Sequence, residues 1–363
     1  MGDKRHDVSV EKLLLTGTTG YIGFKTLLIA LERGYWVRLI VRKESNLNDL
    51  RAKHELVAKA SEQKRLEFVV ISDFTDAVSI ERALQGITAI IHLASPLAKA
   101  DSDFEKNIVD PAVLMVNTIL ESAAKVLTVQ RVVITSSCVT LIPFEWNFNP
   151  DSETLYTAQN LNSNPTKPYT NAMEAYWASK ALARIATRDF TANQKPHFDY
   201  VNLLPSVVIG PDERIPIDGH VDELLSGARA AVLAPALTSD LNSAFPYVGV
   251  PVHVADVARA HVDAVNANLI PGDTEYILSS DTPEGVEWDR DVSNAAQKYF
   301  AAEVSNGVLP LKGALQTIKW RIDAMSTEEA FGWKFTSFEE TARQLIAQYI
   351  QLKGNQTVGS KGK

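Results

Sequence analysis

Tyr176 and Lys180 form the pair of side chains best suited to proton chemistry in this sequence. They lie four residues apart in YWASK, within the segment 171–190, which we predict to be a long helix. Residues with this spacing share one face of a helix, so the phenol and the ammonium are expected to point into the same cleft. A neighbouring cation favours the phenolate and lowers the pKa of a tyrosine. The pair is therefore suited to general acid catalysis by the tyrosine.

Two serines at the end of a predicted strand supply a third group. In RVVITSSC, the strand 131–135 runs into Ser136 and Ser137. A hydroxyl at the carboxyl end of a parallel strand can hold a carbonyl oxygen and stabilise the charge that develops on it. Serines at strand ends also simply form turns. The Tyr-x-x-x-Lys spacing is equally inconclusive alone, because it recurs in Tyr21 and Lys25.

Three glycines could bring a phosphate group close to the backbone. In LLLTGTTGYIG, Gly17, Gly20 and Gly23 follow a predicted strand at 12–15 and open a predicted helix at 21–33. Glycines in this context allow a tight turn and a close approach to a pyrophosphate, and the start of a helix offers N–H groups. The spacing is G-x-x-G-x-x-G, whereas the general dinucleotide fingerprint is G-x-G-x-x-G. A dinucleotide site and a turn required only for packing both stay open.

Arg42 and Lys43 follow the second predicted strand, 35–41. An acidic residue at this point typically binds the ribose of NAD, whereas an arginine accommodates the 2′-phosphate of NADP. Two cations here would form a charge-assisted clamp for that phosphate, so NADP(H) is the predicted cofactor. Glu44 keeps NAD as an alternative, and the two cations are also compatible with an ordinary solvated surface.

The elements that must position these groups alternate between strands and helices. Further strands are predicted at 66–71, 89–93 and 200–204, and further helices at 77–84 and 111–126. This alternation predicts an α/β protein with a Rossmann-type, doubly wound parallel sheet.

The regular alternation of strands and helices ends after about residue 206, where proline and glycine become frequent and the predicted strands shorten. We therefore predict an NADP-binding Rossmann domain at 1–205, a smaller, mostly C-terminal α/β substrate lobe at 206–352, and a disordered tail at 353–363. The long irregular loop at 141–170 belongs to the first domain. It is a candidate for substrate binding, because loops of this length are usually functional.

The composition excludes several classes of partner. The net charge of −8 argues against nucleic-acid binding. The N-terminus has no apolar core, and no segment approaches the ~18 apolar residues of a membrane helix, so we expect no secretory signal and no membrane span. A single cysteine, Cys138, excludes an internal disulfide and fits a reducing compartment. We therefore expect a cytoplasmic protein, and the histidine spacing indicates no metal site.

The chain resembles the extended short-chain dehydrogenase/reductase family in five motifs that occur in the family's order: TGTTGYIG, HLASP, VVITSSC, YWASK and LLPSVVIGP. It is most similar to the branch of dihydroflavonol reductases, cinnamoyl-CoA reductases and fungal or yeast NADPH-dependent aldehyde and ketone reductases. The resemblance covers roughly residues 11–350. It implies NADP(H) as cofactor, a small-molecule carbonyl substrate, and either a monomer or a homodimer.

The resemblance also implies roles for individual residues. Ser137 matches the catalytic serine, Tyr176 the proton donor, and Lys180 the lysine that assists it and binds the nicotinamide ribose. Asp73 and Phe74 match the pair at the adenine. Tyr176 and Lys180 are also predicted to bind the cofactor. The other predicted cofactor-binding residues, which include Lys43 of the clamp, are Gly17, Gly20, Tyr21, Ile22, Gly23, Arg42, Lys43, Asp73, Phe74, Leu93, Ala94, Ser95, Pro205, Ser206, Val207 and Val208.

Two departures from the family pattern bear on the substrate and on packing. Dihydroflavonol reductases carry an asparagine five residues after the catalytic serine, where this chain has Ile142. The helix after HLASP usually carries a small Gly-Thr pair, and here it reads VLMV at 113–116. The first departure favours a more apolar carbonyl substrate than a flavonoid. Trp177, Phe144 and Trp146 are candidates either for lining the substrate pocket or for packing.

The function predicted from these features is NADPH-dependent reduction of an aldehyde or ketone to an alcohol, with Tyr176 as proton donor. One alternative is an NAD(P)-dependent epimerase/dehydratase or hydroxysteroid-type dehydrogenase of the same family. The other is a non-catalytic NADP-binding regulator, a class that typically lacks the Tyr/Lys pair.

Overall fold

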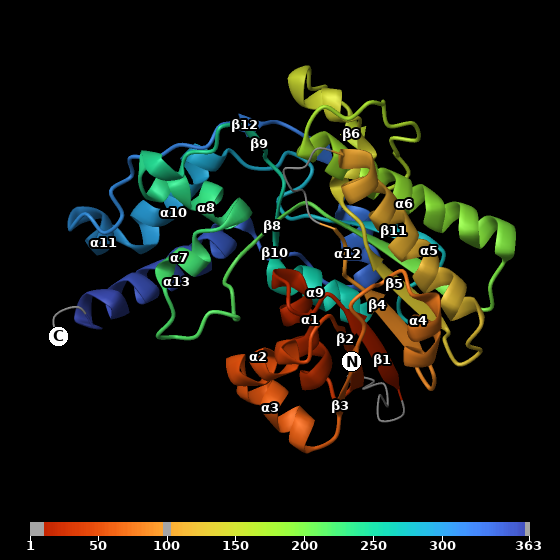
Figure 1. Cartoon of the computed structure of the whole chain (residues 1–363). Helices are drawn as coiled ribbons and strands as arrows, with labels where there is room; N and C mark the ends of the chain where they lie inside the picture. The colour runs from red at the N-terminus through yellow and green to blue at the C-terminus, as the bar shows by residue number, and fades with distance from the viewer. Residues whose placement is uncertain (1–10, 97–102, 360–363) are drawn as a thin grey trace. The chain divides into compact units, whose positions relative to one another are not determined.

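The computed structural model describes residues 11–96 and 103–359 (Figure 1). Within these residues the chain forms two compact units. The first contains the residues up to Phe144 with Ala158–Leu204 and Ala258–Tyr276, and the second contains Glu145–Thr157, Pro205–Val257 and the residues from Ile277 onward. Each unit is therefore built from separate stretches of the chain.

A seven-stranded sheet organises the first unit, in the order β11-β7-β5-β4-β1-β2-β3. The strands are β1 (Lys12–Thr16), β2 (Trp36–Val41), β3 (Leu66–Val70), β4 (Ala89–His92), β5 (Arg131–Thr135), β7 (Asp199–Pro205) and β11 (Thr274–Leu278). The pairings from β3 through to β7 are all parallel. The predicted Rossmann-type fold is confirmed, and the strand order reverses between β1 and β4, where ligands bind in such sheets.

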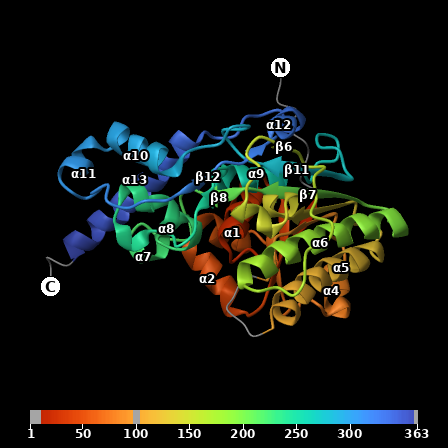
Figure 2. The ribbon, with the colours of Figure 1, turned by 90° about the horizontal axis from the view of Figure 1, so that it is seen from above.

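Helices cover the sheet and explain its apolar sequence. The neighbouring helices α4 (Ala77–Ala83), α5 (Asp110–Ala124) and α6 (Ala172–Gln194) lie along one side of the unit (Figure 2). Leu14 of β1 and Ile90 of β4 pack with Ile119 of α5 in a shared core. Strands buried in this way read as continuous apolar runs.

The remaining elements of the first unit are α1 (Tyr21–Glu32), α2 (Ser45–Lys53), α3 (Glu55–Glu62), the π-helical turn η2 (Glu105–Val109) and the 3₁₀ turn η3 (Cys138–Leu141). Helix α9 (Val254–Asp263) leads the chain back into this unit. Helices α2 and α3 were not predicted. The apolar contribution of α2 is small, with only Leu47 and Leu50 buried, so its sequence carries a weak helical pattern.

The second unit combines short strands with helices around Trp288, which is fully buried and packs edge-on against Phe338 at 5.2 Å between ring centres. Its strands are β6 (Leu155–Tyr156), β8 (Val207–Ile209), β9 (Tyr247–Val248), β10 (Pro251–His253), β12 (Thr317–Ile318) and β13 (Arg321–Ile322). Its helices are α7 (Val221–Leu224), α8 (Gly227–Leu233), α10 (Trp288–Tyr299), α11 (Ala301–Ser305), α12 (Met325–Phe331) and α13 (Phe338–Gly359), with the 3₁₀ turns η4 (Phe144–Phe148), η5 (Ala234–Ala236) and η6 (Ser239–Leu241).

The observed division differs from the predicted one, and the first unit's stretch ends at Leu204, so that Pro205 belongs to the second unit. Part of the long loop, Glu145–Thr157, belongs to the second unit, and Ala258–Tyr276 belongs to the first because its strand β11 extends the central sheet. The predicted disordered tail at 353–363 is wrong for 353–359, which continue helix α13. The four residues after Gly359 lie outside the described part of the chain.

Among residues 11–96 and 103–359, no helix has the length and apolar character needed to cross a membrane.

Candidate active site

The glycine turn links the end of β1 to the start of α1. Gly17 has a φ of +74°, which favours glycine, and a Cβ there would lie 2.8 Å from the Ala94 nitrogen. A Cβ on Gly23 would overlap the Gly17 carbonyl oxygen. Gly20 is the N-cap of α1 and contributes no side-chain hydrogen bond. Packing thus requires Gly17 and Gly23, and the helix start keeps the geometry that suits an anionic group.

Thr16 fixes the neighbouring segment against this turn. Its Oγ1 accepts hydrogen bonds from the N–H groups of Leu93 at 3.1 Å and Ala94 at 3.0 Å, just beyond β4. With both acceptor positions used, the Thr16 hydroxyl donates to Nδ1 of His92, 3.0 Å away. The predicted residues Leu93 and Ala94 are therefore held beside the glycine turn by a threonine that the sequence analysis did not single out.

His92 is a buried, neutral histidine. Because Nδ1 accepts from Thr16, the ring proton sits on Nε2. Burial, with a smaller effect of the Lys180 charge, lowers the pKa of His92 to about 3. The ring therefore stays uncharged across the physiological pH range.

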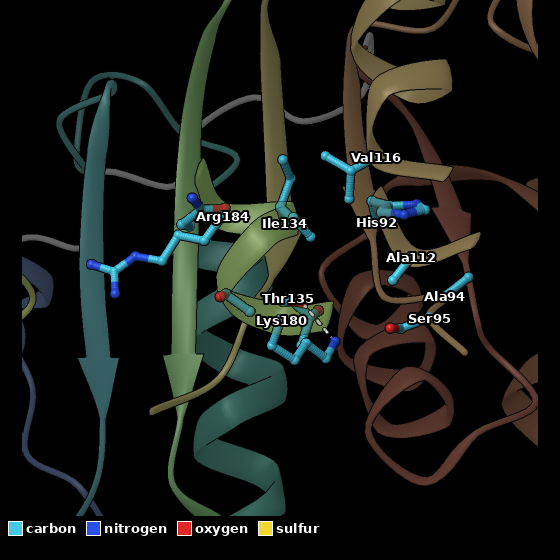
Figure 3. A pocket seen from close by; sticks show the side chains of 12 residues that line it. His92, Ala94, Ser95, Ala112, Val116, Ile134, Thr135, Lys180 and Arg184 are labelled. Atoms are coloured by element: carbon cyan, nitrogen blue, oxygen red, sulfur yellow. Dashed lines mark hydrogen bonds between the residues drawn. The ribbon is translucent and has the colours of Figure 1, made fainter. Parts of the chain in front are cut away.

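The first unit brings Ser137, Tyr176 and Lys180 together. Lys180 Nζ lies 5.9 Å from the centre of the Tyr176 ring. It also lies 3.4 Å from the Thr135 carbonyl oxygen (Figure 3). Ser137 and Tyr176 are joined by a side-chain hydrogen bond. Ser137 follows β5, and Tyr176 and Lys180 share one face of α6. The three predicted groups thus meet at the carboxyl edge of the sheet, where Asn171 caps the helix by accepting from the N–H groups of Met173 and Glu174.

Burial dominates the ionisation of this group. The pKa of Tyr176 is raised because burial disfavours the phenolate by more than the hydrogen bond to Ser137 favours it. Burial lowers the pKa of Lys180 to about 8. The net pKa of Tyr176 therefore lies above its ordinary value, because loss of solvent outweighs the hydrogen bond to Ser137.

The predicted adenine end of the site lies after β2 and β3. The Arg42 guanidinium lies 5.9 Å from the centre of the Phe74 ring, which is 6 % exposed. Arg42 and Lys43 are both exposed. Asp73 accepts from the N–H and hydroxyl of Thr75, and these bonds lower the pKa of its carboxyl. Arg42 is therefore already aligned on an aromatic surface and reachable from solvent.

The other predicted cofactor residues lie on or just after strands, or at the first turn of α1. Tyr21 and Ile22 open α1, and Ser95 follows β4. Pro205 ends β7, and Ser206, Val207 and Val208 continue into β8. These last four residues belong to the second unit.

A buried charge network connects α6 with strand β11. Arg184 donates to Glu275 Oε2 of β11 at 3.0 Å through Nε, to Thr140 Oγ1 at 2.8 Å and to the carbonyl of Asn160 at 2.9 Å. Its fourth partner is the Ala158 carbonyl. Hydrogen bonds from arginines and from Asn202 outweigh burial and lower the pKa of Glu275. This network has no signature in the sequence, because its members are far apart in the chain and share no spacing.

The other residues considered in the sequence as possible site residues pack against neighbouring groups in the structure. Cys138 is buried, with its Sγ 3.0 Å from the Leu204 carbonyl, and burial raises the pKa of its thiol. Ile142 is 1 % exposed, so this position contributes to the core. Trp177 and Phe144 stack edge-on at 5.5 Å in the first unit. Trp146 packs with Trp320 at 5.5 Å in the second.

Comparison with known proteins agrees with this fold. A model of the NAD dependent epimerase/dehydratase family matches residues 13–276. Ketoreductase CTB6 of Cercospora beticola is 32% identical over 354 residues, which cover 94% of this chain and 95% of the relative. Dihydroflavonol 4-reductase of Arabidopsis thaliana is 27% identical over 270 residues, covering 74% of this chain and 65% of that protein.

The crystal structure of yeast methylglyoxal/isovaleraldehyde reductase Gre2 complexed with NADPH has the same fold. The TM-score is 0.74 at 20% identity, with 95% of this chain and 99% of that chain covered. The family resemblance predicted from the motifs is therefore confirmed. The chain belongs to the NAD dependent epimerase/dehydratase family, within the extended short-chain dehydrogenases/reductases and in the branch of dihydroflavonol reductases and fungal ketoreductases.

Proposed function

We propose that the protein reduces an aldehyde or ketone to an alcohol, with NADPH as the hydride donor. The observation that carries the proposal is the grouping of Ser137, Tyr176 and Lys180 at the carboxyl edge of a Rossmann-type sheet. A non-catalytic nucleotide-binding protein has no need of a buried lysine beside a partly buried tyrosine, because burial makes the charged form of each costly.

The chain's residues fit a nicotinamide cofactor. The glycine turn and the uncapped start of α1 suit the pyrophosphate, because N–H groups and the helix dipole favour a negative charge there. Arg42, exposed beside Phe74, suits the 2′-phosphate of NADPH, and Lys43 adds a second cation. Leu93 and Ala94, fixed by Thr16, would flank the nicotinamide half.

In the proposed mechanism the bound cofactor supplies hydride to the carbonyl carbon. Ser137 donates a hydrogen bond to the carbonyl oxygen and holds it next to Tyr176. Tyr176 gives its proton to that oxygen as negative charge develops there. The raised pKa of Tyr176 keeps the phenol protonated before the reaction. Lys180, largely charged at neutral pH with a pKa of about 8, stabilises the phenolate that remains.

The relatives support the reductase over the alternatives. The relative that is 32% identical is a ketoreductase, and the structural neighbour is an aldehyde reductase complexed with NADPH. A relative of Alternaria alternata, 33% identical, carries the name NAD-dependent epimerase/dehydratase ALT6, and Glu44 beside Arg42 is compatible with NAD. Epimerase/dehydratase chemistry is therefore the second candidate.

A cofactor titration followed by a substrate panel tests the proposal. The purified protein is titrated with NADPH and NADH by nicotinamide fluorescence, and then mixed with aliphatic and aromatic aldehydes and ketones while the absorbance of the reduced nicotinamide is followed. Tighter binding of NADPH, with its consumption on some carbonyl compound, is the expected result. Tight binding without consumption of any substrate would contradict the reductase and favour an epimerase or a regulator. Failure to bind either cofactor would refute the nucleotide site.

A further inference from the structure

A small cavity lies beneath Lys180, between the sheet and the two helices that cover it (Figure 3). Its volume is about 20 Å³. The floor comes from strands β4, β5 and β7, through His92, Ile134 and Asn202. The cover comes from Val116 of α5 and from residues of α6 that include Lys180. Its lining residues all belong to the first unit.

The strand register explains why polar groups gather here. Thr16 pairs with His92, His92 pairs with Ile134, and Ile134 pairs with Asn202. Paired residues of adjacent strands point to the same face, so these four form a row across the sheet under α5 and α6. Ser136, two residues beyond Ile134, faces the same way. The row brings His92, Asn202 and Ser136 to one buried place.

Each of these three residues has one buried polar atom without a partner. Among the described residues, nothing bonds to Nε2 of His92, Oγ of Ser136 or Oδ1 of Asn202. The other side-chain nitrogen of His92 is bonded to Thr16, and that of Asn202 donates to Glu275 at 2.9 Å. An unsatisfied buried polar group costs about 1–3 kcal/mol, so three lining one cavity call for a common ligand.

The chemistry of the lining selects the ligand. His92 Nε2–H is a donor, Asn202 Oδ1 is an acceptor, and the Ser136 hydroxyl is both. Lys180 adds an ammonium whose bond to the Thr135 carbonyl is long, at 3.4 Å. A metal ion would face that ammonium, and an anion would face the Asn202 oxygen. Water can both accept from the donors and donate to the acceptors, and a cavity of ~10–15 Å³ on this measure holds one molecule.

We propose that this cavity is an interior hydration site, in which ordered water bonds to His92 Nε2–H, Asn202 Oδ1 and Ser136 Oγ and solvates Lys180 from beneath. His92, Ser136 and Asn202 are then positioning residues, which act on Lys180 through the water. Of the charged groups near Lys180, Arg184 is neutralised by Glu275, His92 is neutral, and Tyr176 is protonated. Among the described residues the ammonium has the long bond to the Thr135 carbonyl, and the water is the group that can further compensate it for lost solvent.

A crystal structure of the unaltered protein, determined without and with NADPH at a resolution that shows water, tests the site directly. The expected result is a water peak within hydrogen-bond distance of at least two of the three atoms in both crystals. A dry cavity, a cavity closed by movement of the side chains, or a part of the cofactor in this place would overturn the inference. This test does not depend on turnover, so it stands or falls separately from the proposed function.

A matched pair of variants tests the effect on Lys180. Ser136→Val and Ser136→Thr add the same volume, but only threonine keeps the hydroxyl. Titration of the Lys180 side chain by NMR in carbon-13-labelled protein should show a midpoint lower by about half a pH unit or more in the valine variant than in the threonine variant. Equal midpoints in the two variants would contradict the proposed role of the water. If the valine variant does not fold, the crystal structure of the unaltered protein still decides.

Discussion

Lys180 is 8 % exposed, and burial lowers its pKa from 10.5 to about 8. When the pKa of a cationic group is lower in the folded state than in the unfolded chain, the charged form of the group reduces the free energy of unfolding relative to its neutral form. The unfolded chain holds the proton more tightly, so the cost of burial applies in full below pH 8. It declines as the pH rises from about 8 to about 10.5. At neutral pH, Lys180 therefore opposes folding.

Replacing Lys180 by methionine should consequently stabilise the protein while it abolishes turnover. We expect the free energy of unfolding at pH 7 to rise by about 2–3 kcal/mol, because an apolar chain of similar length removes the buried charge. The gain should shrink as the pH rises from 8 to 10. Urea unfolding at several pH values measures this. Lys59→Met, at an exposed position, is the control for the loss of a lysine. Destabilisation of Lys180→Met at pH 7, or a gain that grows with pH, would contradict the buried-cation account.

Arg42 should decide the preference between the two nicotinamide cofactors. Arg42→Ala removes the guanidinium beside Phe74 and should weaken NADPH binding by about 10–100-fold, because bonds to charged groups contribute about 1.5–3 kcal/mol. NADH binding should change little, since NADH lacks the 2′-phosphate. Fluorescence titration with both cofactors checks this, with Lys43→Ala alongside. Equal losses for both cofactors would show that Arg42 does not contact the 2′-phosphate.

At the scale of elements, the turn between β1 and α1 contains two glycines, Gly20 and Gly23, at which an added Cβ would meet different amounts of space. A Cβ at Gly23 would overlap the Gly17 carbonyl oxygen, whereas a Cβ at Gly20 would lie 3.2 Å from that oxygen. Gly23→Ala should therefore cost at least about 1–3 kcal/mol or prevent folding. Gly20→Ala should fold with a much smaller loss. Thermal unfolding of the two variants measures the difference, and equal stability would contradict the tight backbone contact at Gly23.

The strands and major helices of the first unit were predictable because their apolar residues form continuous runs or helical repeats, and Gly34 and Gly86 mark the ends of two of the helices. The predicted strand at 131–135 is β5, and the predicted helix at 77–84 is α4 to within a residue. Helix α3 was missed, although His54 accepts from the Leu56 N–H and caps it. Histidine is not a usual cap, so the sequence carried no recognisable start signal.

The candidate site was only partly predictable. Tyr176 and Lys180 could be found because their spacing lies within one helix. Thr16, His92 and Asn202 are brought together by the register of four strands, β1, β4, β5 and β7, which are distant in the chain. A single sequence does not specify strand register, so no local pattern could identify this row.

At the scale of the whole molecule, the first unit depends on a segment that returns late in the chain. Ala258–Tyr276 rejoins it, where His261 bonds to Thr135 at 2.7 Å and Arg131 donates to the Ile270 carbonyl at 3.0 Å. Glu275 pairs with Arg184, which is 1 % exposed. The segment is thus attached by polar contacts at buried positions.

Glu275→Ala should strongly destabilise the protein, because it leaves the buried Arg184 without its carboxylate. We expect a loss of about 3–5 kcal/mol in the free energy of unfolding. Glu275→Gln keeps the shape and one acceptor, so its loss should be intermediate. Denaturant unfolding of both variants, with the exposed Glu329→Ala as control, measures these values. A loss in Glu275→Ala no larger than in Glu329→Ala would show that the ion pair does not hold the segment.

The role of Tyr176 as proton donor is the central claim, and one comparison tests it most directly. Unaltered protein and Tyr176→Phe are titrated with NADPH, and NADPH consumption is then measured with the best carbonyl substrate of the panel. Phenylalanine keeps the ring but lacks the proton, so NADPH should bind with nearly the same affinity while turnover falls by about 10²–10⁴-fold. Turnover within a few-fold of the unaltered protein would contradict the mechanism.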